Sequence, residues 1–545
     1  MATSVKSKRS QSKAKGSKKS KKNKGQKSGK PALSKKEQKT LQRKRAKAIS
    51  KFISVAAPTA AVALLIGVAL FFVKDEKLAI AGAGGIIAMV LCYQYPFQGL
   101  WFFLFYMPFA GTVTYWIGGG NAIFQLAKDG FYFPALLAIN QQLKRKRQPF
   151  IVNKALKQPL YILLAVCVVI LLLVNGVQQL NPEGGDKPLP MGILGLKVFL
   201  GYIPLMTCAF YQIKSNKELL FLTRSTLVLA IICCVLGVVQ YQFLASGRCK
   251  GTDHLIGDDL FKATLDAKCL VGGSLVFSPS QNMIRLPGTF VAPWQWAWFL
   301  ISNAFFTFAT AFSDPSPKWR TLGLVGMALV FINSAISGQR IALALVPLVT
   351  VILLVLTGQV TNLKRFLPVG AGLGLILTII IVTNPQVLQE RIDSFVSRWQ
   401  ASPPTAFIAE QFEFTTQGDM QLLGNGIGRA TNSARMFGET KLIETYYPKL
   451  IYEIGPVGTL AFLGFVTTIT MTTFKTYRSL KDKNVRSFGA ALWVFILIMS
   501  YNTYYYPLDV DPVAVYYWYF AGVIYRLPDI DKQEQKRLKE EAEQS

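Results

Sequence analysis

The chain has one histidine, His254, in 545 residues, and its seven cysteines are scattered. No group of these residues has the spacing of metal ligands, so we expect neither a metal site nor a cofactor. Charged residues are also scarce. They make up 16% of the chain, against 51% for hydrophobic residues. A soluble chain of this length would divide into several domains around modest cores, and this composition excludes that class of protein.

The first 50 residues hold few apolar residues and almost no acids. Lysine, serine and glycine dominate, and Glu37 is the single acidic residue. This composition cannot form a core, so the sequence predicts a disordered cytoplasmic tail, which serves as a topology signal or is attracted to anionic headgroups. No small-residue cleavage site follows the first apolar segment, which excludes a secretory signal peptide. No aromatic residues lie among the lysines, and we expect no nucleic-acid partner.

Long apolar segments occupy most of the remaining chain. Residues 51–526 contain about fourteen runs that approach the roughly 20 residues needed to cross a bilayer as a helix. Helices satisfy their own backbone polar groups in lipid. The sequence therefore predicts an all-α, polytopic membrane helix bundle of about 12–14 transmembrane helices. A second charged cytoplasmic tail, residues 527–545, follows the bundle.

Lysine and arginine predict the orientation of this bundle. If the N-terminus is cytoplasmic, the connections 144–158 and 475–487 lie inside, and both are strongly basic. Basic connections remain on the cytoplasmic side of a membrane. We therefore expect a multi-pass protein of the plasma (inner) membrane with both termini cytoplasmic. The long loops 244–289 and 384–449 are then on the outer side.

The outer loop 244–289 contains both Cys249 and Cys269. Two cysteines that share one exported loop favour a disulfide, because that compartment is oxidising; two unpaired thiols are the alternative. His254 lies in the same loop. It could act as a catalytic base, but a lone loop histidine is more often incidental.

The stretch 422–458 is polar and glycine-rich, and it leads into the apolar segment 450–474. It contains Arg429, Glu453 and three regularly spaced glycines, Gly424, Gly426 and Gly428. A nucleotide loop is excluded because no strand precedes the glycines and the stretch faces outward. We expect the glycines to let backbone N–H groups approach an anion. An ordinary connection between membrane helices is the alternative.

Two arginines lie beside predicted spans. Arg285 precedes the segment that begins at residue 290, and Arg340 lies in the short turn between segments 321–336 and 341–357. A cation placed there is costly unless it has a partner or a function, although Arg340 could also snorkel to the interface.

Residues 501–520 are rich in tyrosine, which favours an interfacial aromatic belt over a sugar-stacking platform.

Three motifs together resemble one family. They are Arg285-Leu-Pro-Gly-Thr-Phe, Ser337-Gly-Gln-Arg340-Ile-Ala, and Gly424-Asn-Gly-Ile-Gly428 followed by Tyr452-Glu453-Ile-Gly455-Pro-Val-Gly458. Their order is similar to that in the O-antigen ligase/polymerase superfamily, multi-pass glycosyltransferases of the GT-C type. The lysine-rich head and the layout look most like the cyanobacterial members that act in hormogonium polysaccharide biosynthesis.

The resemblance implies an enzyme that moves a glycan from a polyprenyl-pyrophosphate carrier to an acceptor hydroxyl on the outer face for exopolysaccharide biosynthesis. Arg285 and Arg340 match the arginines that hold the pyrophosphate, and the glycines, Arg429 and Glu453 fall in the other motifs. The family's histidine position reads Glu444-Thr445 here. Glu444 then becomes the candidate base, unless it is an ordinary loop glutamate. Other polysaccharide export proteins are the expected partners.

Physical chemistry supports the same assignment. A pyrophosphate leaving group gains negative charge, and arginine binds phosphate oxygens in bidentate fashion without a metal. The acceptor hydroxyl needs a base within hydrogen-bond reach.

Two alternatives remain open. One is a transporter of an anion or a lipid-linked sugar, which would need broken helices in paired repeats. The other is a non-catalytic assembly protein, which the missing family histidine favours.

Overall fold

The computed structural model describes residues 35–73, 76–260, 263–279, 283–365, 403–417 and 421–543, with scattered positions between 367 and 400. The chain divides into two compact units, Met1–Pro58 and Thr59–Ser545. Residues 1–34 of the predicted tail lie outside the described residues. Residues 35–50 are helical, so the expectation of disorder fails for that part.

The described residues are almost entirely helical, with one two-stranded sheet. The helices of the first half are α1 (Lys35–Val73), α2 (Glu76–Gln94), α3 (Pro96–Tyr106), α4 (Ala127–Arg145), α5 (Lys157–Ile170), α6 (Gly176–Leu180), α7 (Pro188–Leu200), α8 (Leu205–Gln212) and α9 (Asn216–Ala245). Those of the second half are α10 (Pro293–Ser313), α11 (Pro317–Ile336), α12 (Arg340–Leu356), α15 (Pro404–Thr416), α16 (Tyr446–Arg478), α17 (Lys483–Tyr501) and α18 (Val513–Glu543). Strands β1 (Val276–Ser278) and β2 (Met283–Arg285) pair antiparallel.

Eight of the described helices are long and apolar enough to cross a membrane, by length and composition. The predicted all-α polytopic bundle is therefore confirmed as a fold class. Other segments that the sequence predicts to span are shorter or less apolar. One of the fourteen apolar runs, residues 97–116, forms α3 followed by a 3₁₀ turn and a short π-helix, Thr112–Ile117.

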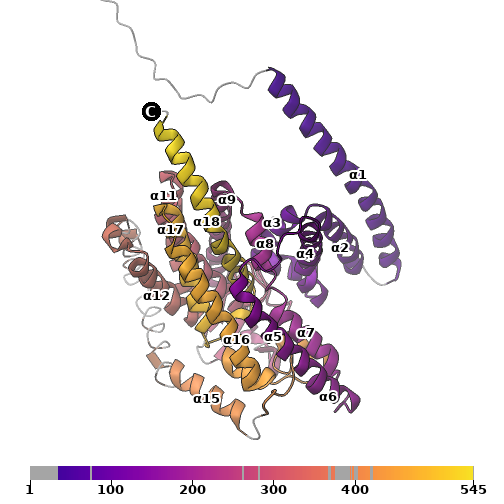
Figure 1. The fold of residues 1–545 in the computed structure, drawn as a ribbon. Coiled ribbons are helices and arrows are strands. Elements are labelled where there is room, and N and C mark those ends of the chain that lie inside the picture. The colour runs from indigo at the N-terminus through magenta and orange to yellow at the C-terminus, as the bar shows by residue number, and fades with distance from the viewer. Residues whose placement is uncertain are drawn as a thin grey trace, which may run out of the picture. The chain divides into compact units, whose positions relative to one another are not determined.

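Helix α10 forms the centre of the second half of the bundle. Nearly every residue from Trp296 to Ser313 is buried, because α9, α11, α12 and α17 all pack against it. Helices α16, α17 and α18 pack against one another (Figure 1), and α17 and α18 also contact α10. A helix that is apolar all round is a core helix. The motif that contains Arg285 thus leads directly into the best-packed element of the fold.

The aromatic residues at the start of α18 are not an interfacial belt. Tyr516, Tyr517, Trp518 and Tyr519 are each at most 3% exposed. Their rings pack inside the bundle; Tyr516 stacks on Phe520 with centroids 5.7 Å apart. The predicted belt is therefore wrong for these residues, which are part of the core.

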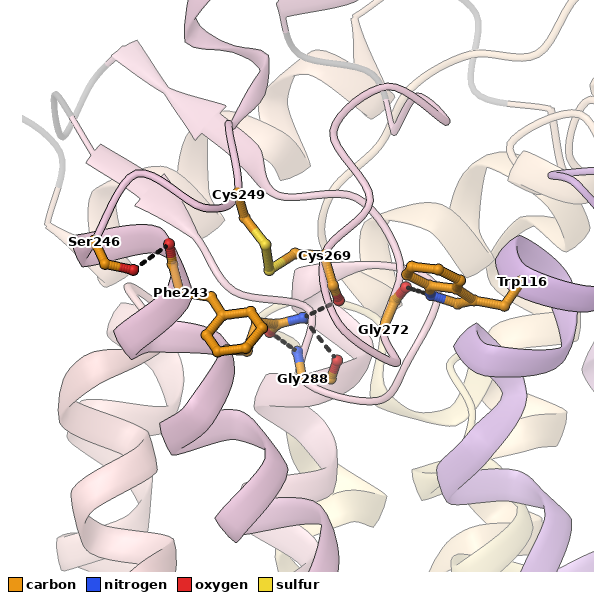
Figure 2. The surroundings of a disulfide bond; sticks show 8 residues. Trp116, Phe243, Ser246, Cys249, Cys269, Gly272 and Gly288 are labelled. Carbon is orange, nitrogen blue, oxygen red and sulfur yellow. Dashed lines mark hydrogen bonds between the residues drawn. A yellow bond between two sulfur atoms is a disulfide. The ribbon is translucent and has the colours of Figure 1, made fainter.

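The loop after α9 contains the predicted disulfide between Cys249 and Cys269 (Figure 2). Gln240 of α9 ties the same loop to the bundle, since its amide nitrogen donates to the carbonyl oxygens of Cys269 and Gly288 at 3.1 and 3.2 Å. The Trp116 indole donates to Gly272 O at 3.2 Å (Figure 2). The connection between α9 and α10, which also contains β1 and β2, is therefore packed against the helices.

We expect non-reducing mass spectrometry of the purified protein to find the peptides of Cys249 and Cys269 joined. The five other cysteines are buried and unpaired, so they should be alkylated only after denaturation and supply an internal control. Alkylation of both Cys249 and Cys269 without reduction would contradict the link.

Candidate functional site

Strand β2 and the turn before α12 are in direct contact, which brings the Arg285 and Arg340 motifs together. The Leu286 N–H donates to Ser337 O at 3.0 Å. Gly338 has a φ of 69°, and a side chain there would lie 3.3 Å from Ile284 O and 3.4 Å from the Cα of Arg285. Glycine is needed where a turn has this conformation and lies this close to another strand. Arg340 is the first residue of α12, directly after this turn.

The segment that contains Glu444 is held between two other segments. Thr445 pairs with Tyr504 in an antiparallel bridge, and the Tyr446 N–H donates to Thr503 O at 2.7 Å. On the other side, the Glu444 N–H donates to the side-chain oxygen of Gln411 in α15 at 3.0 Å. The loop after α17 and helix α15 therefore position Glu444 at the start of α16.

Arg285, Glu444 and Tyr505 belong to one electrostatic cluster. Burial lowers the pKa of the Arg285 guanidinium, while Tyr505 and Glu444 oppose that shift. Burial raises the pKa of the Tyr505 hydroxyl, and Tyr504 and then Glu444 add to the effect. The pKa of Tyr506 is also raised, first by burial and then by Glu444. The Glu444 carboxylate thus interacts with the guanidinium and with both phenols.

Three buried polar atoms in this cluster have no hydrogen-bond partner among the described residues: Arg285 Nε, Gln339 Nε2 and Thr445 Oγ1. Gln339 is 7% exposed and Thr445 is fully buried. Leaving such an atom unpaired costs about 1–3 kcal/mol. One of the three atoms comes from β2, one from the turn before α12 and one from the segment that precedes α16.

Residues 424–428, the glycine stretch, lie outside the Glu444 cluster. They pack against an interruption in α16. Gly455 has a φ of 65° inside that helix. The unwound carbonyl oxygens of Tyr452 and Glu453 accept the N–H groups of Asn425 and Gly426 at 2.8 and 3.1 Å. The interruption of α16 therefore leaves two carbonyl oxygens free to accept hydrogen bonds from the glycine stretch.

The three predicted glycines are required for packing. Their φ values are all positive, and an added Cβ would lie 2.5, 3.0 and 2.4 Å from neighbouring atoms at Gly424, Gly426 and Gly428. Asn175 Oδ1 accepts the Ile427 N–H at 3.0 Å, and Asn175 Nδ2 donates to Ile427 O at 3.0 Å. The N–H groups of residues 424–427 bond within the protein, which favours a packing role for the glycines; an anion contact at this stretch stays a prediction.

Arg429 and Glu453 also have partners inside the protein. The Arg429 guanidinium donates to Asp186 at 2.5 Å, and this bond lowers the pKa of the Asp186 carboxyl. Glu453 is 3% exposed, and its carboxylate accepts from the Ala430 N–H at 2.7 Å and the Thr431 hydroxyl at 2.9 Å. We assign both residues a supporting role rather than a contact with substrate.

This supporting network reaches the Glu444 cluster at two points. Lys449 forms ion pairs with Asp509 and, at 4.0 Å, with Glu453. Asp509 ends the loop that contains Tyr505 and Tyr506. In addition, the Asn432 amide donates to the Tyr506 hydroxyl at 3.4 Å. The glycine stretch thus fixes the loop beside Glu444 without forming the site itself.

The structure also shows which of the remaining candidate residues belong to the cluster. His254 is exposed on a 3₁₀ turn, Thr252–His254, outside this cluster. Tyr505, Gln339 and Thr445 are the cluster residues that sequence reasoning missed. One signal was available, because Gln339 and Thr445 each adjoin a residue that the motifs single out. The φ of 48° at Tyr505 has no sequence signal.

Replacing Asn175 by leucine should destabilise the protein by about 2–4 kcal/mol, because the buried N–H and C=O of Ile427 lose their partner. Thermal unfolding of the detergent-purified protein measures the effect. Asn140→Leu in α4 is the matched control, since Asn140 makes no hydrogen bond within the described chain. Equal melting temperatures for the two variants would show that Asn175 does not hold the glycine stretch.

Neither the known protein-family models nor the curated proteins contain a match to this chain. The functional argument therefore depends on the geometry above and on the motifs.

Proposed function

We propose that the protein is a multi-pass membrane glycosyltransferase that polymerises or ligates glycans carried on a lipid pyrophosphate. The observation that supports it is the cluster of Arg285, Glu444 and Tyr505, which lies on segments that also hold buried polar atoms without partners in the described chain. The cluster combines a buried cation with a carboxylate. Those are the groups that transfer from a pyrophosphate requires.

In the proposed reaction, the bond between the anomeric carbon and the pyrophosphate oxygen breaks. A new bond forms between that carbon and the acceptor oxygen, and the acceptor proton passes to the Glu444 carboxylate. The lipid pyrophosphate leaves as an anion. Arg285, with Arg340 from the adjacent turn, stabilises its developing charge. Burial strengthens this interaction, because Arg285 is withdrawn from water.

The position of the cluster suits a substrate with a long lipid tail. Arg285 is eight residues before the start of α10, and Arg340 begins α12. Glu444 lies two residues before α16, one of the helices long enough to cross a membrane. Arg340 and Glu444 are thus at or beside helix starts, and Arg285 ends the strand that precedes α10, so the lipid tail can stay in the bilayer beside these helices. We place this end on the outer face of the plasma membrane, where other polysaccharide export proteins would meet it.

Purified protein in proteoliposomes tests the proposal. With a polyprenyl-pyrophosphate-linked oligosaccharide, we expect longer or transferred glycan together with stoichiometric free lipid pyrophosphate. Movement of the intact lipid-linked glycan across the membrane, without bond cleavage, would contradict the proposal and favour a transporter. Absence of both activities, in protein that binds the substrate, would favour an assembly role.

A further inference from the structure

An apolar site, distinct from the polar Arg285 cluster, lies in the first half of the chain. A cavity of about 150 Å³ is enclosed by the loop between α4 and α5, by α5, and by the chain around α8. Its lining is apolar and includes Phe150, Leu156, Leu160, Leu164, Ile203 and Met206. A lining this apolar offers almost no hydrogen-bonding partner to water. The occupant should therefore be hydrocarbon rather than water.

The cavity opens onto the apolar surface of α5. Leu164 lines the cavity and is 37% exposed. Its neighbours Tyr161, Ile162 and Val168 are 59%, 49% and 47% exposed. Helix α5 forms the core of a segment long and apolar enough to cross a membrane, so these side chains face lipid. A lipid chain could enter the cavity from that surface.

Basic residues lie next to the cavity lining in the sequence. Exposed cations flank the lining residues in sequence: Lys144, Arg145, Lys146, Arg147, Lys154 and Lys157. The loop 144–158 contains no acidic residue, and none of the six cations forms an ion pair within the described chain. Arg147 is three residues from Phe150, so it lies within about 11 Å of the cavity lining.

Hydrogen bonds within the protein hold the loop in place. The Tyr211 hydroxyl donates to Pro149 O at 2.9 Å, and the Thr207 hydroxyl donates to Phe150 O. Asn153 caps the short helix Lys154–Leu156 by accepting the Ala155 N–H at 3.0 Å. The arrangement of apolar cavity and adjacent cations is thus preformed, which reduces the cost of binding.

We propose that this site binds an anionic phospholipid, with part of one acyl chain in the cavity and the headgroup phosphate at the basic loop. The apolar lining selects a chain, and the uncompensated cations select a negative headgroup. The inference is independent of the glycosyltransferase proposal, since the site shares no residue with the Arg285 cluster.

Native mass spectrometry of the full-length protein, exchanged from detergent into phosphatidylglycerol or phosphatidylcholine, tests the proposal. We expect phosphatidylglycerol to be retained preferentially, and each cation removed, as in Arg147→Gln or Lys154→Gln, to weaken its retention about fivefold. Leu164→Trp should fill the cavity and abolish retention. Ile162→Trp is the matched control, because Ile162 is exposed on the same helix but does not line the cavity.

Equal retention of the two lipids would overturn the headgroup assignment. Equal retention in Leu164→Trp and Ile162→Trp, with both variants monodisperse on size exclusion, would overturn the acyl-chain assignment. Displacement of lipid by a second copy of the chain, seen as a lipid-free dimer, would also contradict it.

Discussion

Replacing Glu444 by glutamine should lower glycan transfer about 10²–10⁴-fold, the usual contribution of a general base. Glutamine has nearly the same shape, and the backbone contacts of residue 444 with Gln411 remain possible. The fold should therefore persist while the proton acceptor is lost. In cells, the lipid-linked precursor should accumulate at a normal protein level. With purified protein, release of lipid pyrophosphate measures the rate directly.

Glu439→Gln is the matched control, because Glu439 is an exposed glutamate only five residues before Glu444. It should keep full activity. Glu444→His should recover part of the lost activity, since an imidazole can also accept the acceptor's proton. A fully active Glu444→Gln enzyme would show that the base is another residue.

Replacing Arg285 by lysine should lower the rate about 10²–10³-fold, even though the charge is kept. Lysine lacks the planar fork that binds two phosphate oxygens at once. The Arg285 Nε, which is buried and without a partner among the described residues, would be absent as well. Arg340→Lys should behave in the same way, because its turn packs against β2.

Arg248→Lys supplies the control for these variants. Arg248 is exposed in the loop that precedes the strands and lies over the Phe243 ring, with 5.3 Å between the guanidinium carbon and the ring centroid. Its replacement should leave transfer unchanged. Unchanged transfer in Arg285→Lys, at the same protein level, would contradict pyrophosphate binding at that arginine.

Part of this architecture could be predicted from the sequence. Long apolar segments force the chain into helices that satisfy their own backbone groups, so the fold class follows from composition alone. Two cysteines in one loop were sufficient to predict their pairing. The Arg285 and Arg340 motifs were also singled out, because a cation beside an apolar segment is costly unless it has a role.

Other features depend on contacts between distant parts of the chain. The glycines of 424–428 resemble an anion loop until Asn175, about 250 residues earlier, is found to hold the Ile427 backbone. Tyr516 and Tyr517 resemble a belt because hydropathy does not distinguish a lipid-facing ring from one packed in a bundle. The neighbourhood of Tyr505 and Glu444 arises from the pairing of residues 445–446 with residues 503–504, which leaves no pattern in the sequence.

Photo-crosslinking with a polyprenyl pyrophosphate that carries its reactive group beside the phosphates tests the central claim most directly. We predict label on the peptides that contain Arg285, Gln339 and Tyr505, and its loss when unlabelled lipid-pyrophosphate glycan competes. Label confined to other peptides, or label that the glycan does not displace, would contradict a pyrophosphate site at this cluster.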